Sequence, residues 1–147
     1  MQRKGGVPNI PRGGQPPLIL VIDDDTAFRE TAEALLAQFG YAVTTAESGD
    51  AALRAIEREL PAIILLDVFM PGMDGFAFLK ILRARAIHVP VVVTSGAVPH
   101  GDPDPLLSTA TALGAAGALR KPFRIQELQR LIAEVAPAIG TGAAEER

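Results

Sequence analysis

Short, uninterrupted runs of hydrophobic residues recur through the middle of the chain and predict β-strands. A short apolar run without polar alternation fits a strand that is covered on both faces, as in a parallel sheet. The predicted strands are residues 18–22, 41–45, 62–66, 89–93 and, as the weakest of them, 117–120.

The segments between these strands carry hydrophobic residues at helical spacing and are predicted to be helices. Gly40 and Pro61 would stop the first two helices, and Ser48 and Asp74 can cap the second and third. A short alanine-rich helix is expected over about 105–114. The predicted inner faces consist of Phe28, Ala32, Leu35, Leu36 and Phe39; Ala52, Leu53, Ile56 and Leu60; Phe76, Leu79 and Leu82; and Ile125, Leu128, Leu131, Ile132 and Val135.

Strands and helices thus alternate as βαβαβαβαβα, which indicates an α/β fold with a parallel sheet between two layers of helices. The fold would occupy residues 18–136, since a chain of 147 residues suits one domain with a sizeable core. Residues 1–17 contain four prolines and four glycines and are predicted to form a flexible arm. Residues 137–147 are predicted to form a flexible tail.

Composition narrows the classes of function. The formal net charge of −3 gives no overall positive field for nucleic acid. The lack of cysteine excludes disulfides, cysteine-ligated zinc and thiol catalysis, and it fits a reducing cytoplasm. No hydrophobic run is long enough to span a bilayer, and the basic start lacks the apolar segment of a secretory signal.

Polar residues that could bind a ligand or take part in a reaction stand at the ends of four predicted strands. In a parallel sheet these ends meet at one edge, where open α/β sheets place their ligands. The residues are Asp23, Asp24 and Asp25 after the first strand, Asp67 after the third, Thr94 and Ser95 at the fourth, and Lys121 after the fifth.

This set of groups predicts a site for a phosphoryl group. Crowded carboxylates repel one another unless a cation or proton intervenes, and Mg²⁺ prefers such hard oxygen ligands. The ammonium of Lys121 suits a phosphate, and the hydroxyl of Thr94 could donate to an anion held between them. Asp67 is then the candidate nucleophile, since carboxylates can form aspartyl-phosphates.

Each residue taken alone also has an ordinary structural interpretation. Asp67 could start a turn, and the aspartates after the first strand could be a solvated helix N-terminus. Thr94 could be a β-branched strand residue, and Lys121 an exposed lysine. Their joint position at four strand ends favours the functional interpretation. The two histidines, His88 and His100, fall in predicted loops and receive no role.

Four motifs of the chain resemble those of the receiver domain of bacterial two-component response regulators. They are Val21-Ile22-Asp23-Asp24-Asp25, Leu65-Leu66-Asp67-Val68-Phe69-Met70-Pro71-Gly72-Met73-Asp74-Gly75, Val92-Val93-Thr94-Ser95-Gly96 and Arg120-Lys121-Pro122-Phe123. The similarity covers about residues 18–136. It implies a three-layer, flavodoxin-like doubly wound fold with five parallel strands in the order 2-1-3-4-5.

The resemblance also implies roles for individual residues. Asp67 would accept a phosphoryl group from a phosphohistidine on a sensor histidine kinase or a histidine phosphotransfer protein. The implied ligands of Mg²⁺ are Asp23, Asp24, Asp67 and the backbone carbonyl of Phe69, and the implied partners of the phosphoryl group are Thr94 and Lys121. The peptide bond before Pro122 would be cis, which a proline makes energetically accessible.

Three positions bear on how such a switch would work here. Ala118 occupies the place where the family usually has the aromatic switch residue of strand five. Residues 96–105 contain three prolines, so a regular helix is not expected there and the family's usual output face is altered. Phe69, two residues after the acceptor, is expected to shield the phosphoryl group from water and slow its hydrolysis.

The implied function is a signalling switch and not an enzyme that turns over a substrate. Because no DNA-binding segment follows the last helix, a stand-alone receiver is expected, without direct contact to nucleic acid or membrane. It would act on a downstream protein or in a phosphorelay, with a weak homodimer as an open question. A receiver cut from a larger protein would look the same.

Two alternative functions stay open at this point. A degenerate receiver would serve only as a protein-binding module, and Ala118 would favour it. A phosphatase of the haloacid dehalogenase type would also use a nucleophilic aspartate after a strand. It is disfavoured because Ala27 stands where that family has Thr or Val, and because there is no cap insertion.

Overall fold

The computed structural model describes residues 15–96 and 104–139, and it contains a five-stranded parallel sheet in the order β2-β1-β3-β4-β5. The strands are β1 (Leu18–Ile22), β2 (Ala42–Ala46), β3 (Ile63–Asp67), β4 (Val91–Ser95) and β5 (Gly117–Arg120). The helices are α1 (Thr26–Gln38), α2 (Gly49–Arg58), α3 (Gly75–Ala84), α4 (Asp104–Ala112) and α5 (Ile125–Val135). The predicted fold class and strand order are therefore confirmed.

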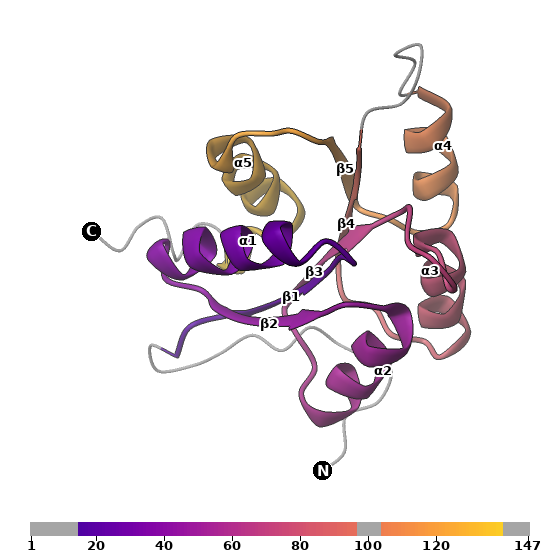
Figure 1. Ribbon diagram of the computed structural model, residues 1–147, viewed down its shortest axis with the longest axis horizontal. Helices are drawn as coiled ribbons and strands as arrows, with labels where there is room; N and C mark the ends of the chain where they lie inside the picture. The colour runs from indigo at the N-terminus through magenta and orange to yellow at the C-terminus, as the bar shows by residue number, and fades with distance from the viewer. Residues whose placement is uncertain (1–14, 97–103, 140–147) are drawn as a thin grey trace.

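The helices cover both faces of the sheet, as Figure 1 shows, with α1 and α5 on one face and α2, α3 and α4 on the other. Alternate residues of the central strands enter the two resulting cores. Leu20 and Leu66 pack toward Phe78 of α3, whereas Ile19 and Leu65 pack toward Leu36 of α1. The three central strands are buried along their whole length. Burial on both faces explains why their sequences show continuous hydrophobic runs.

Three of the helices begin at a side chain that caps their first turn. The side-chain oxygen of Asp25 accepts hydrogen bonds from Ala27 N at 3.0 Å and Phe28 N at 3.4 Å. Ser48 caps α2 through Ala51 N at 3.1 Å, and Asp74 caps α3 through Ala77 N at 2.8 Å. The caps predicted at Ser48 and Asp74 are thus confirmed, and each satisfies an amide that the helix leaves without a partner.

The predicted limits of β1 and β5 are confirmed, whereas those of β2, β3 and β4 differ by one or two residues. β4 begins at Val91 instead of residue 89, because Pro90 has no amide to donate and only its carbonyl joins the ladder, to Ile64 N at 3.0 Å. β3 runs one residue further than expected, so Asp67 belongs to the sheet. Thr94 lies opposite Asp67 in the ladder. These side chains are therefore held by strand hydrogen bonds and not by a loop.

The packed part of the chain extends beyond the predicted domain end. Residues 137–139 form a helical turn after α5, and Ile139 is buried in the core on the α1 and α5 face. The flexible tail predicted from 137 is therefore wrong for these three residues, because the apolar side chain of Ile139 finds a place in that core. At the other end, the carbonyl of Pro17 accepts from Ala42 N at 2.9 Å.

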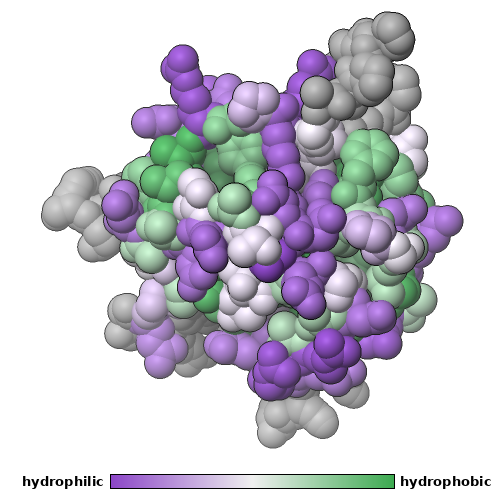
Figure 2. Space-filling model, viewed as in Figure 1, coloured by the Kyte–Doolittle hydropathy of each residue, from purple (hydrophilic) through white to green (hydrophobic). Residues whose placement is uncertain are grey.

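The remaining parts of the predicted arm, tail and proline-rich loop, at 1–14, 140–147 and 97–103, lie outside the described residues. Within the described part of the chain, no helix is long and apolar enough to cross a membrane. On the face that Figure 2 presents, hydrophobic residues form separate patches among hydrophilic ones.

The peptide bond between Lys121 and Pro122 is cis, as the resemblance implied.

The start of α3 packs so closely on the end of β3 that it needs a glycine. A Cβ added to Gly75 would lie 2.7 Å from the Cα of Val68 and 2.8 Å from the carbonyl oxygen of Asp67. Both are backbone atoms that cannot move aside like a side-chain end. The amide of Gly75 also donates to the carbonyl of Val68 at 2.8 Å, which fixes the approach.

We therefore expect Gly75→Ala to lower the free energy of unfolding by about 1–3 kcal/mol through overpacking. Urea denaturation followed by circular dichroism would measure the change. Gly96→Ala is the matched control, because a Cβ at Gly96 meets no atom of the described residues within 4 Å. Equal stability of the two variants would contradict the close contact.

Candidate functional site

The carboxyl ends of β1, β3, β4 and β5 bring the predicted polar residues to one edge of the sheet. Asp67 pairs with Thr94 across β3 and β4, and Ser95 pairs with Arg120 across β4 and β5. Asp23 follows the last residue of β1, and Lys121 follows the last residue of β5. The sheet therefore brings these groups to one edge, as the sequence predicted.

A partly buried ion pair joins a residue near the start of the domain to one near its end at this edge. The Nζ of Lys121 lies 2.6 Å from Oδ2 of Asp23, although the residues are 98 positions apart. The side chain of Asp23 is 1% exposed, and its second oxygen, Oδ1, accepts from Asp25 N at 2.9 Å. The carboxylate of Asp23 is thus held on both sides, as a buried charge requires.

Asp67 is a buried carboxyl group with an unfavourable electrostatic environment. Its Oδ1 accepts a hydrogen bond from Phe69 N at 3.2 Å. The pKa of Asp67 is raised to about 6, chiefly by burial and then by the negative charge of Asp23, whereas Lys121 and the Phe69 amide act in the opposite direction. A carboxylate at this position is therefore stabilised by anything that adds positive charge.

A metal ion held by three carboxylates at the edge would supply such positive charge. Oxygen atoms of Asp23, Asp24 and Asp67 lie within 4.8 Å of one another. Asp23 and Asp67 are buried, while Asp24 is exposed to solvent. Few protein oxygens at a partly wet site suit Mg²⁺, which keeps several of its own waters. The donor set and its charge therefore fit the predicted ion.

The hydroxyl of Thr94 is a buried polar group without a partner. Thr94 is 1% exposed, and its Oγ1 makes no hydrogen bond in the described structure. A buried hydroxyl without a hydrogen bond is costly, by about 1–3 kcal/mol. Because Thr94 is the strand neighbour of Asp67, its hydroxyl is available to an oxygen of a group attached to that aspartate.

Two residues on α1 also reach the site, and sequence reasoning did not assign them to it. The guanidinium of Arg29 donates to the backbone carbonyl of Asp23 at 2.6 Å and to Thr26 Oγ1 at 3.2 Å. The ring of Phe28 lies under the ammonium of Lys121, with 4.2 Å between Nζ and the ring centroid. Their position in the first turn after the aspartates was the only sequence signal.

The other residues considered in the sequence have the following positions in the structure. Phe69 is 60% exposed, and its amide donates to Oδ1 of Asp67. Ala118 is partly buried on β5 against the core shared with α3 and α4, so no aromatic ring lies at that position. His88 is exposed and has no contact with the site, and His100 lies outside the described residues.

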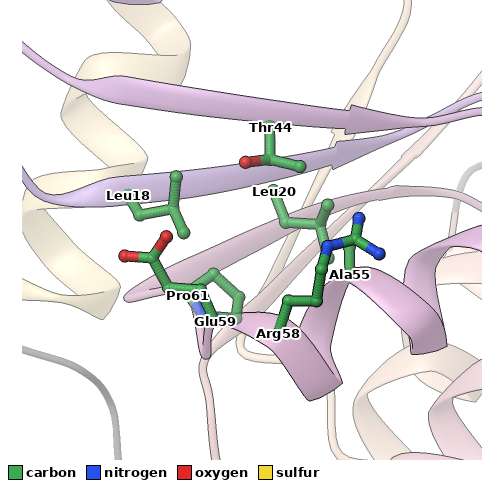
Figure 3. Close-up of a pocket in the computed structure, with 7 residues that line it drawn as sticks. All are labelled: Leu18, Leu20, Thr44, Ala55, Arg58, Glu59 and Pro61. Carbon is green, nitrogen blue, oxygen red and sulfur yellow. The ribbon is translucent and has the colours of Figure 1, made fainter.

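A separate pocket lies at the opposite end of the sheet. It has a volume of about 100 Å³ and is lined by Leu18 and Leu20 of β1, Thr44 of β2 and residues around the end of α2 (Figure 3). Leu18 begins the strand whose other end delivers Asp23, so this pocket is not part of the candidate site.

Comparison with known proteins accounts for this arrangement of residues. The family model described as "Response regulator receiver domain" matches residues 19–133. The chain belongs to the response regulator receiver domain family. Its predicted function as a response regulator receiver is thereby confirmed, and neither the binding-module nor the phosphatase alternative is favoured.

The relatives of this receiver domain include regulators that are longer than the chain. It is 38% identical over 115 residues to the DNA-binding transcriptional regulator NtrC of Salmonella typhimurium, covering 78% of the chain and 24% of NtrC. It is 42% identical over 127 residues to the transcriptional regulatory protein FixJ of Azorhizobium caulinodans, covering 86% of the chain and 57% of FixJ. The chain thus spans about a quarter to just over half of these proteins.

Solved structures of receiver domains share the fold over nearly their whole length. The chemotaxis protein CheY4 of Vibrio cholerae superposes with a TM-score of 0.72 and 30% identity, covering 82% of this chain and 98% of CheY4. The receiver domain of NtrX from Brucella abortus gives a TM-score of 0.70 and 33% identity, with 84% and 98% covered.

The raised pKa of Asp67 predicts that removing its charge stabilises the metal-free receiver domain. Since the folded-state pKa of about 6 exceeds the unfolded value, the contribution of Asp67 to stability is most favourable below about pH 4 and is lost as pH rises through about 6. At pH 7.5 in EDTA, we expect Asp67→Asn to raise the free energy of unfolding by about 2 kcal/mol.

Urea denaturation at pH 5 and pH 7.5 would test this expectation, with a smaller difference between wild type and variant at the lower pH. Asp74→Asn is the matched control, because Asp74 is an exposed helix cap that asparagine replaces well. Destabilisation by Asp67→Asn at pH 7.5 would contradict the electrostatic argument.

Proposed function

We propose that this receiver domain is a phosphorylation switch in which Asp67 is the phosphoacceptor. The observation that carries the proposal is the meeting of a buried acceptor carboxyl, an unpartnered Thr94 hydroxyl and a Lys121 ammonium at one sheet edge. A carboxylate nucleophile, a hydroxyl donor and a cation are what transfer of a phosphoryl group requires of the protein.

In the proposed reaction, an oxygen of Asp67 forms a bond to phosphorus as the bond from phosphorus to a donor imidazole nitrogen breaks. The imidazole leaves and takes up a proton. The proposed donors are a sensor histidine kinase or a histidine phosphotransfer protein. Thr94 then donates its hydroxyl to a phosphoryl oxygen, and Lys121 pairs with another. The protein contributes mostly position and charge, as in other phosphoryl transfers.

We propose Asp23, Asp24, Asp67 and the backbone carbonyl of Phe69 as the ligands of Mg²⁺. A divalent cation supplies positive charge that offsets the phosphoryl oxygens and the crowded carboxylates. The fit rests on the carboxylate oxygens within 4.8 Å and on the raised pKa of Asp67, which indicates unbalanced negative charge.

The proposed output is contact with a downstream protein or passage of the phosphoryl group along a relay. DNA binding belongs to the named function of NtrC and is not carried over to this chain. A weak homodimer and a cytoplasmic location remain part of the proposal. With Ala118 on β5, the output is expected to depend on movement near Thr94 without an aromatic ring that turns.

Acetyl phosphate with Mg²⁺ tests the proposed acceptor, because a small phosphodonor replaces the unidentified kinase. We expect intact-protein mass spectrometry to show the mass of one added phosphoryl group on the wild type. Asp67→Asn should abolish this gain, since an amide is not a nucleophile here, and omission of Mg²⁺ should reduce it. The exposed Asp74, substituted by asparagine, is the control that should still be labelled.

The outcomes of this labelling separate the candidate functions. No added mass on the folded wild type would support a binding-only module. Continuous release of phosphate from a phosphomonoester would instead support a phosphatase. A single addition that Asp67→Asn removes supports the switch.

The lifetime of the phosphoryl group is expected to depend on Phe69. Its large, 60% exposed side chain follows Asp67 by two residues, and its amide is bound to the acceptor carboxylate. We expect Phe69→Asn to speed loss of the acyl-phosphate severalfold by admitting water, while Phe69→Leu stays near wild type. The lifetime of the acyl-phosphate would be measured by timing its decay after removal of acetyl phosphate. Unchanged or slower decay in Phe69→Asn would contradict shielding by Phe69.

A further inference from the structure

We propose that Phe28 is a positioning residue that holds the Lys121 ammonium at the phosphorylation site through a cation–π contact. The inference rests on the proposed role of Asp67 as acceptor and extends it to a residue of α1. It concerns what keeps Lys121 in place while the anions around that lysine change.

The contact joins parts of the chain that are distant in sequence. Phe28 lies in the first turn of α1, and Lys121 follows β5. The Nζ of Lys121 is 4.2 Å from the centroid of the Phe28 ring, well within the range of a cation–π interaction. The same ammonium is 2.6 Å from Oδ2 of Asp23, so it contacts a carboxylate and an aromatic face together.

The Phe28 ring is itself fixed from the side of Lys121. Phe123 packs against it in an edge arrangement, with ring centroids 6.0 Å apart and the planes at 75°. Phe123 comes two residues after Lys121 and follows the cis peptide bond. The segment that carries the lysine thus also carries the ring that orients Phe28.

The ring of Phe28 can hold the Lys121 ammonium when the lysine leaves the carboxylate of Asp23. The side chain of Lys121 has a flexible four-carbon stem and is 21% exposed, so it can swing to solvent when an anion releases it. In the proposed reaction, Lys121 must exchange Asp23 for a phosphoryl oxygen. The face of Phe28 attracts the ammonium without carrying charge, so it does not compete with the phosphoryl group.

The ordinary interpretation is that Phe28 only fills the core. It is partly buried and packs against the cluster formed by α1 and α5, a place where leucine would also fit. The two interpretations differ in chemistry, because a leucine retains apolar area but has no negative ring face. A variant that keeps the ring and one that keeps only the apolar bulk therefore separate them.

The test compares phosphorylation rates with acetyl phosphate and Mg²⁺ for wild type, Phe28→Leu and Phe28→Tyr. We expect Phe28→Leu to lower the rate about three- to tenfold, the range of a partly desolvated cation–π contact, and Phe28→Tyr to restore it. Phe39→Leu is the matched control, since Phe39 packs against the same cluster at the other end of α1.

A double-mutant cycle adds a readout that a packing role would not change. In a Lys121→Gln background, which removes the cation, Phe28→Leu should have no further effect on the rate. A second signature is the NMR shift of the Lys121 ε-methylene protons, displaced by the ring in the wild type and in Phe28→Tyr but not in Phe28→Leu.

The outcomes keep this inference apart from the proposed function. If the wild type takes up no phosphoryl group, the acceptor proposal fails while the NMR signature still reports on Phe28 and Lys121. If the wild type is labelled and Phe28→Leu matches Phe39→Leu in rate, the positioning role is overturned. An equal effect of Phe28→Leu with and without Lys121 would also overturn it, since the ring would then act by packing alone.

Discussion

The crowding of negative charge at the carboxyl edge of the sheet is the constraint on which this domain depends. Parallel pairing delivers Asp23 and Asp67 to the same buried edge, where the charge of Asp23 makes Asp67 harder to ionise. One cation, Lys121, offsets this charge through its ion pair with Asp23. Because Lys121 is paired with Asp23, unbalanced negative charge is left at Asp67, and this imbalance favours the proposed metal binding and phosphoryl transfer.

The same edge shows how stability is given up for function. Thr94 has a buried hydroxyl without a partner among the described residues, and the carboxyl group of Asp67 lies in an environment that disfavours its charge. Both are unfavourable for the folded state, and in the proposed reaction a phosphoryl group and its cation would offset both. The surrounding structure tolerates them because the three central strands are buried along their full length and lie between two packed helical layers.

Much of the site could be predicted from the sequence because each residue stands at the end of a hydrophobic run. A buried parallel strand has a strong sequence signal, and its last residue must lie at the functional edge. The strand limits were less certain, since Val89 is as hydrophobic as the strand that follows it and only Pro90, with no amide, sets the start of β4. The extent of the packed domain was also missed, because Ile139 stands alone among polar and small residues.

The sequence by itself determined the alternation of elements, the order of the motifs and the set of groups at the sheet edge. These follow from local hydrophobic periodicity and from short motifs with fixed positions. Only the tertiary structure decided the distant partners: Lys121 lies against Asp23 and over the ring of Phe28, and the hydroxyl of Thr94 has no partner among the described residues. The physical reason is that such contacts join residues far apart in the chain, and their distances depend on how the helices pack on the sheet.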